Sequence, residues 1–262
     1  MKGLLIAFSM YTKIPMPRVD WDAKSMRHVF LFFPFVGVLL GGLAYGWLVL
    51  ARWQECNGLL TAAGLVLLPL LVTGGIHLDG FLDTSDALNS YADTEKKLAI
   101  LKDPHVGAFG VIRCAMLLLA QAGLWAQVIG NSSFWVLAVW GFVMSRVLTG
   151  VLALTLPLAK NTGLAHMFTE GADKKPVVRA LIFLGVLAVV SLLAWHWQAG
   201  LTEELLRAGI TAVALLTALL LWFPRMARKQ FGGITGDLLG YFLQLAELAV
   251  LLAAAGGAVL CG

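Results

Sequence analysis

The chain has 262 residues, of which 60% are hydrophobic and 13% are charged, whereas soluble domains contain about 45–50% apolar and about 25% charged residues. This composition excludes a soluble globular enzyme, a disordered chain and a nucleic-acid-binding module, despite the net charge of +4. The three cysteines, Cys56, Cys114 and Cys261, form neither a CxxC nor a Cys/His pattern, so no disulfide framework or zinc site is indicated. The composition indicates a polytopic membrane protein.

The chain begins with an apolar stretch that is too short to cross a bilayer. Residues Lys2 to Met10 are followed by Pro15 and Pro17, without the small-residue cleavage site of a secretory signal. We expect a short N-terminal helix that is interfacial or re-entrant.

Seven later runs approach the roughly 20 apolar residues that a helix needs to cross about 30 Å of hydrocarbon. Backbone groups in lipid must be satisfied within their own segment, so each run is predicted to be a helix. The predicted spans are residues 28–51, 58–76, 106–129, 133–158, 178–198, 205–223 and 238–260. The sequence shows no obvious internal repeat and no low-complexity linker between the spans. Residues 1–262 are therefore predicted to form a single all-α, polytopic membrane helical bundle.

The positions of Lys and Arg predict the orientation of this bundle. With a cytoplasmic N-terminus, 15 of the 19 Lys and Arg residues fall on the cytoplasmic side, only Arg52 and Arg207 fall on the other side, and two lie within spans. This asymmetry predicts the N-terminus inside and the C-terminus outside. Eleven of the 15 acidic residues lie on the same cytoplasmic side. We therefore expect the chemistry of the protein at that face.

Three aspartates open an acidic cytoplasmic segment, about residues 77–105, directly after the second predicted span. On a helix, Asp83 lies about 40° from Asp79 and Asp86 about 20° from it on the other side, so the three carboxylates share one face. Like charges at this spacing repel and raise each other's pKa. A divalent cation relieves the repulsion, and hard oxygen ligands suit Mg²⁺. The alternative is a solvated acidic helix face. The apolar span next to the cluster argues against it, because carboxylates near the membrane core are costly.

A second polar motif precedes the third predicted span. Lys102 is suited to neutralise a phosphate, Asp103 to join the metal site, and the helix start at Gly107 to accept an anion. The alternative is an interfacial helix with an ordinary cap and proline break. His105, alone at an interface, is more typical of a structural residue.

A third motif, rich in glycine, precedes the last predicted span. Backbone NH groups at Gly232 and Gly233, next to Thr235 and Asp237, are placed to cradle phosphate or ribose oxygens at a helix N-terminus. Asp237 alternatively caps that helix.

Two ionisable residues fall inside predicted spans. Glu247 lies about two and a half turns into the last span, and Arg146 lies in the fourth. A charge at such depth is expected to be neutral or paired. We expect these two residues to pair with each other for stability.

Together these motifs resemble the cobalamin synthases, the adenosylcobinamide-GDP ribazoletransferases, over nearly the whole chain. Phe8 to Pro17 is similar to the family's N-terminal motif, and Phe33 to Gly37 to its FPxxG motif. Residues 77–86 match its HLDGxxDTxD signature, 102–110 resemble (K/R)DSxxGxxG, and 232–247 resemble GGxTGDxxGxxxE.

The sequence departs from the family's pattern in two places. Ala87 stands where the family usually has Gly, and Pro104 and His105 replace the common Ser-Arg. The second departure puts a functional role of His105 in question.

The resemblance implies the last condensation of adenosylcobalamin assembly. α-Ribazole, or its 5′-phosphate, displaces GMP from adenosylcobinamide-GDP with Mg²⁺ at the cytoplasmic face of the bacterial inner membrane. The implied partners are these two substrates, the lipid bilayer and other cobalamin-assembly enzymes, with an oligomer left open.

Roles follow for the motif residues. Asp79, Asp83 and Asp86 are expected to hold one or two Mg²⁺ ions against the diphosphate. One of these three aspartates, with Asp79 as the first choice and Asp83 as the second catalytic candidate, or else Asp103, orients or deprotonates the 5′-hydroxyl of ribazole. Lys102 stabilises the leaving phosphate. The remaining residues expected to bind substrate are Lys13, His77, Gly107, Gly232, Gly233, Thr235 and Asp237.

Two other functions compete with this interpretation. A CDP-alcohol-type phosphotransferase also uses spaced aspartates and a divalent metal, but its Asp-Gly signature continues with Ala-Arg and later paired aspartates, which this sequence lacks. An ion-coupled transporter predicts charges near the bilayer midplane and broken, repeated spans, whereas the acids here gather at one surface.

Overall fold

The computed structural model describes every residue except 1, 22, 27, 160–172, 201 and 261–262. Four charged residues that enter the orientation argument, Asp22, Arg27, Lys160 and Glu170, lie outside the described residues. Within the described part, helices are joined by short loops, and one isolated bridge pairs Leu158 with Ile234. The helices are α1 (Lys2–Tyr11), α2 (Ala23–Met26), α3 (Val29–Trp53), α4 (Gly58–Thr73), α5 (Ile76–Asn89), α6 (Thr94–Ile100), α7 (Ala108–Val128), α8 (Ser132–Thr155), α10 (Lys174–Ala199), α11 (Glu203–Phe231) and α12 (Gly236–Leu260).

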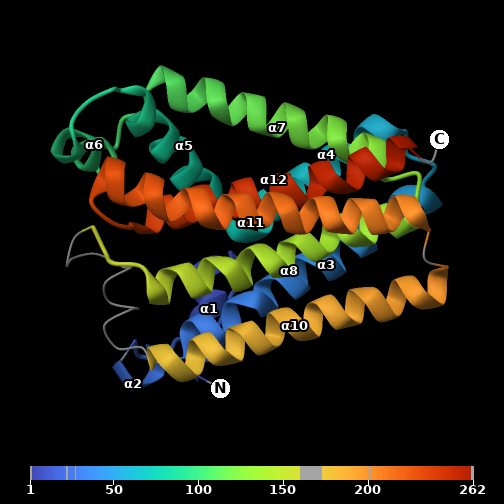
Figure 1. The fold of residues 1–262 in the computed structure, drawn as a ribbon, viewed down its shortest axis with the longest axis horizontal. Coiled ribbons are helices and arrows are strands. Elements are labelled where there is room, and N and C mark those ends of the chain that lie inside the picture. The colour runs from blue at the N-terminus through green and yellow to red at the C-terminus, as the bar shows by residue number, and fades with distance from the viewer. Residues whose placement is uncertain (1, 22, 27, 160–172, 201, 261–262) are drawn as a thin grey trace.

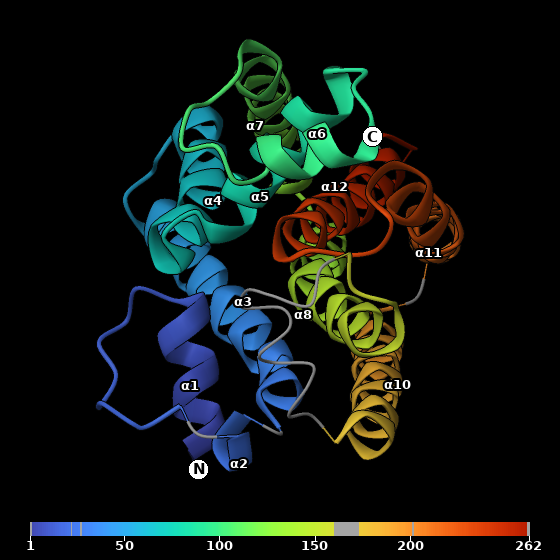
Figure 2. The same ribbon diagram turned by 90° about the vertical axis from the view of Figure 1, so that its left-hand side faces the viewer.

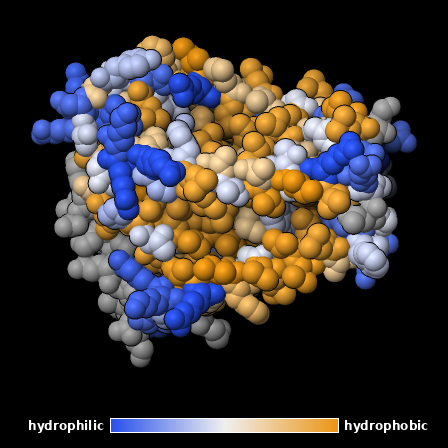
Figure 3. Space-filling view, in the orientation of Figure 1, coloured by the Kyte–Doolittle hydropathy of each residue, from blue (hydrophilic) through white to orange (hydrophobic). Residues whose placement is uncertain are grey.

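Six of these helices are long and apolar enough to cross a membrane: α3, α7, α8, α10, α11 and α12. They run roughly along one axis (Figure 1), and apolar side chains cover the middle of the surface while hydrophilic ones gather at its two ends (Figure 3). The predicted all-α membrane bundle is confirmed. Which compartment each end faces stays a prediction.

The second predicted span differs from its expected form. Helix α4 has only 16 residues, and it reaches the length of a span only together with α5, from which it is bent by 97°. Because the three aspartates lie on α5, beyond the bend, we treat α4 as the membrane-embedded part of this broken pair and assign α5 to the polar end of the bundle. The acidic residues are not a straight continuation of the span.

A pair of glycines makes this break. Gly74 and Gly75 both have positive φ, 67° and 77°, a conformation that glycine adopts without steric cost. The break also receives the chain that follows α1, because the amide of Lys13 donates to the carbonyl of Val72 over 2.7 Å. Helix α1 packs against α3. The N-terminal helix thus brings Lys13 to the start of α5.

Helix α12 holds α5 in place. It packs against α5, α8 and α11, and Figure 2 shows it among these three helices. The contact with α5 is close because two glycines face it: a Cβ on Gly80 would lie 2.8 Å from the carbonyl oxygen of Asp237, and one on Gly240 would lie 3.1 Å from that of His77. This contact brings Asp237 next to the aspartates of α5.

Candidate active site

The three aspartates of α5 lie in different surroundings. Asp79 is exposed, whereas Asp83 and Asp86 are half-buried. The carboxylate of Asp86 accepts a hydrogen bond from the amide of Gly110 over 3.3 Å, and a Cβ on Gly107 would lie 1.9 Å from its Oδ2. Asp86 therefore lies against the N-terminus of α7, where an anion is stabilised.

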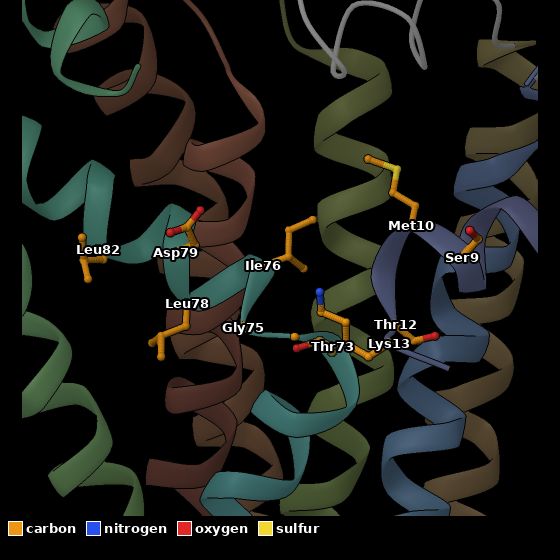
Figure 4. A pocket seen from close by; sticks show the side chains of 11 residues that line it. Ser9, Met10, Thr12, Lys13, Thr73, Gly75, Ile76, Leu78, Asp79 and Leu82 are labelled. Atoms are coloured by element: carbon orange, nitrogen blue, oxygen red, sulfur yellow. The ribbon is translucent and has the colours of Figure 1, made fainter. Parts of the chain in front are cut away.

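A large open cavity of about 660 Å³ lies beside Asp79. Figure 4 shows Lys13 and Asp79 on opposite sides of the α4–α5 break, with Thr73 and Gly75 between them. Ser9 and Thr12 of the N-terminal region also line this cavity. It combines one cation, one carboxylate, several hydroxyl groups and glycine backbone. These groups suit a phosphorylated ligand.

A second cavity of about 270 Å³ lies next to the same aspartate. It shares Met10, Ile76 and Asp79 with the first cavity and extends to Asp237. The two cavities therefore meet at Asp79.

The carboxylates of this region interact with one another. Burial first, and then the nearby charges of Asp79, Asp237 and Asp86, raise the pKa of Asp83 to about 6 from its ordinary 3.8. The folded chain therefore holds the Asp83 proton more tightly than the unfolded chain does. Folding stability from this group is lost as pH rises from about 4 to above 6.

We expect Asp83→Asn to stabilise the metal-free protein at high pH. The substitution removes a crowded charge, so the melting temperature in chelator should rise above the wild-type value at pH 8. At pH 5 the wild-type carboxyl is largely protonated, and the difference should shrink. Thermal unfolding of the detergent-purified protein measures both values. The control is Asp20→Asn in an exposed loop; an equal gain at both pH values for Asp83→Asn would contradict the charge argument.

The motif after α6 lies apart from both cavities. Lys102, Asp103 and His105 are exposed, and none of them lines either cavity. The Asp103 carboxylate accepts from the backbone amide of His105 at 2.9 Å and lies 2.7 Å from its ring Nδ1. These hydrogen bonds hold the pKa of Asp103 below its usual range. The structure does not bring this motif to Asp79.

The glycine-rich turn between α11 and α12 has visible structural roles. Gly232 ends α11 with φ 76°, and a Cβ on Gly233 would lie 2.6 Å from the backbone of Leu158. The hydroxyl of Thr235 accepts from the amide of Leu238 at 3.2 Å. Thr235, rather than Asp237, therefore caps α12. Of the residues predicted in this motif, Asp237 is the one that lines a cavity next to Asp79.

A metal site of three side chains is not preformed. Among the described residues, no group of three or more His, Cys, Asp or Glu side chains is placed to hold a metal ion. Mg²⁺ commonly takes one or two carboxylates and completes its shell with water and substrate phosphates. The donor set here, Asp79 with the neighbouring crowded carboxyl of Asp83, fits that chemistry.

Some cavity residues escaped the sequence analysis. Thr149 lies inside an apolar span, Tyr11 ends an apolar helix, and Thr73 precedes the glycine pair. Threonine and tyrosine in such positions carry no functional signal of their own. The Gly74–Gly75 pair was the one available hint that the chain bends there.

Comparison with known proteins identifies the family. A sequence model of cobalamin-5-phosphate synthase matches residues 3–255. The chain belongs to this family. The resemblance expected from the three motifs is thereby confirmed, and no solved structure matches the chain.

Proteins named adenosylcobinamide-GDP ribazoletransferase are similar to this chain over nearly its whole length. The one from Lachnoclostridium phytofermentans is 38% identical over 255 residues, covering 97% of this chain and 93% of the relative. The one from Clostridium perfringens is 36% identical over 253 residues, covering 96% of each. The one from Desulfitobacterium hafniense is 34% identical over 259 residues, covering 97% and 96%. The family and these names support a membrane transferase of cobalamin synthesis.

Proposed function

We propose that the protein joins adenosylcobinamide-GDP to α-ribazole, or to its 5′-phosphate, with release of GMP. A hydroxyl oxygen of ribazole forms a bond to the phosphorus next to cobinamide. The bond from that phosphorus to the bridging oxygen of GMP breaks, GMP leaves as the anion, and the hydroxyl proton passes to a carboxylate. The product is adenosylcobalamin or its 5′-phosphate.

The attacking group is a ring hydroxyl of the ribose. From the sequence we expected the 5′-hydroxyl, but the family is described by a product that carries a 5-phosphate. A 5′ oxygen that already bears a phosphate has no free hydroxyl for the new bond. The expectation of a 5′-hydroxyl is therefore replaced by a ring hydroxyl.

The position of Asp79 at the meeting point of the two cavities is the observation that carries this proposal. A transfer between two large substrates needs two binding spaces with a proton acceptor between them. Asp79 is exposed and borders both spaces, so it orients the hydroxyl and accepts its proton. Lys13 lies in the larger cavity, where its ammonium group pairs with the diphosphate.

Asp79 and Asp83 would hold Mg²⁺, which when bound neutralises charge on the diphosphate. Asp86 stays a predicted ligand, although its hydrogen bond to Gly110 ties it to α7. Lys102 and Asp103 lie on an exposed loop. Their predicted contribution requires that loop to approach the substrate.

The assay is release of GMP from adenosylcobinamide-GDP by the detergent-purified chain. We expect release that requires α-ribazole and stops when a chelator removes divalent metal. Release of CMP from a CDP-alcohol donor would favour the related phosphotransferase, and absence of nucleotide release from either donor would favour the transporter. Inside-out membrane vesicles should turn over added substrates if the polar end of α5 faces the cytoplasm of the bacterial inner membrane.

Two neighbouring glycines provide a test of Lys13. A Cβ on Gly74 would lie 2.2 Å from Cε of Lys13, whereas one on Gly75 would meet nothing within 4 Å. Both have positive φ, so either change to Ala should cost stability of about 1 kcal/mol. Only Gly74→Ala displaces Lys13, so it should raise KM for adenosylcobinamide-GDP several-fold more than Gly75→Ala. Equal KM values in the two variants would remove Lys13 from the diphosphate site.

A further inference from the structure

The smaller cavity has the size and lining of a site for one flat ring system. Its volume of about 270 Å³ falls just below the roughly 300 Å³ at which pockets for drug-sized ligands begin. Half of its twelve lining residues are apolar or aromatic. The residues of this kind are Met10, Tyr11, Phe30, Phe33, Ile76 and Leu239.

Rings from three helices stand close together on this lining. The centroids of Tyr11 and Phe33 are 4.2 Å apart, and the ring of His77 lies 5.8 Å from Tyr11 and 5.6 Å from Phe33. They come from α1, α3 and α5, respectively. Aromatic side chains in such groups favour stacked or edge-on contact with a further ring.

Two polar atoms on the same lining have no hydrogen-bond partner among the residues that the structure describes. These atoms are Nε2 of His77 and Oγ1 of Thr149, and the two side chains are only 6% and 3% exposed. Leaving a buried polar group unpaired costs about 1–3 kcal/mol. Both residues line the cavity, so a ligand that brings a polar atom into it would satisfy one of them.

We propose that this cavity binds the base of ribazole, a substituted benzimidazole, and thereby selects the nucleoside. The inference rests on the proposed function. A benzimidazole joined to ribose through one ring nitrogen keeps a single acceptor nitrogen and otherwise presents carbon and hydrogen. The hydroxyl of Thr149 donates to that nitrogen while the aromatic side chains contact the ring.

The other bicyclic base of the reaction, guanine, fits this cavity poorly. Guanine carries several donors and acceptors around its edge, and each needs a partner when water is excluded. Half of the lining is apolar or aromatic, and Asp79, one of its two carboxylates, is assigned to the reaction itself. A base with one acceptor needs only one unpaired donor of this lining, so it fits better than guanine does.

The location also suits the reaction. Asp79, Gly236 and Asp237 line the same cavity, so a ribose attached to the bound base lies toward these residues. Ring hydroxyls are close to the carbon that carries the base. A base held in this cavity therefore presents a ribose hydroxyl to Asp79.

Binding of α-ribazole to the full-length protein in detergent, measured by titration calorimetry, tests the proposal. Thr149→Val keeps the shape of the side chain but removes the hydroxyl, and it should weaken binding about tenfold, the equivalent of one hydrogen bond. Thr149→Ser retains the hydroxyl and should bind within a few-fold of wild type. The control is Thr155→Val on the same helix, where the exposed hydroxyl donates to Val151; it should leave binding unchanged.

Each outcome supports or overturns the assignment. Guanosine added in excess should not displace α-ribazole; displacement would assign the cavity to the guanine base instead. Unchanged binding in Thr149→Val, or no binding of α-ribazole to the wild type, overturns the proposal. The GMP-release assay distinguishes failure of the cavity assignment from failure of the proposed function. If GMP release requires α-ribazole, the proposed function stands even when the cavity assignment is wrong.

Discussion

Asp79→Asn is expected to reduce GMP release by about 10³-fold or more while the protein stays folded in the membrane. Asparagine has nearly the shape of aspartate but neither accepts a proton nor binds Mg²⁺ as an anion. Loss of a general base alone costs about 10²–10⁴ in rate. Asp79 is exposed between two cavities, and within the described part of the chain its carboxylate forms no ion pair that the substitution would break. Steady-state GMP release and the melting temperature are measured on the same preparation.

Asp93→Asn is the matched control for this substitution. Asp93 lies in the same acidic segment, is exposed, and caps α6 by accepting from the amide of Lys96 at 2.9 Å. Asparagine caps helices as well as aspartate does, so both stability and turnover should remain near wild type. Normal turnover in folded Asp79→Asn would contradict the role of Asp79 as general base. Equal losses of turnover in both variants would mean that the loss follows from the change in net charge of the segment and not from Asp79 itself.

The bundle was largely readable from the sequence because membrane spans depend on length and apolarity alone. The predicted runs 28–51 and 238–260 correspond to α3, Val29–Trp53, and α12, Gly236–Leu260. The bend after Thr73 was not readable in this way. It depends on two consecutive glycines with positive φ and on the hydrogen bond from Lys13 to Val72. Hydropathy carries no information about either feature.

The candidate site was readable where local spacing determines it. The spacing of Asp79, Asp83 and Asp86 indicated one helix, and α5 contains all three. Tertiary packing then separates their surroundings, because Gly107 and Gly110 bring the start of α7 against Asp86. Helical spacing relates residues of a single helix, whereas the smaller cavity is lined by residues from several helices. The sequence around Thr149 therefore could not identify it as a cavity residue.

Glu247→Gln is expected to cause the largest loss of stability, about 3–5 kcal/mol. Glu247 Oε1 lies 2.6 Å from Nη1 of Arg146, and the two side chains are 8% and 1% exposed. The substitution leaves the Arg146 guanidinium charged inside the bundle without its counter-ion. The other contacts of Nη1, to the Phe142 carbonyl at 2.7 Å and to the Ser145 hydroxyl at 3.2 Å, do not neutralise that charge. Thermal unfolding in detergent measures the loss.

The same substitution at an exposed pair is the control. Glu203 and Arg207 are paired one turn apart on α11 and are 71% and 61% exposed, so Glu203→Gln should change stability by less than about 1 kcal/mol. Arg146→Met combined with Glu247→Gln removes both charges and should recover part of the loss. A small effect of Glu247→Gln alone would mean that water or lipid reaches Arg146.

The recovered stability of the double variant also bears on the candidate site, because the Phe33 ring lies 5.8 Å from the guanidinium of Arg146 and 5.6 Å from the ring of His77. The ion pair therefore supports the residues that form the smaller cavity, and a double variant that regains stability but binds α-ribazole weakly would show that support directly.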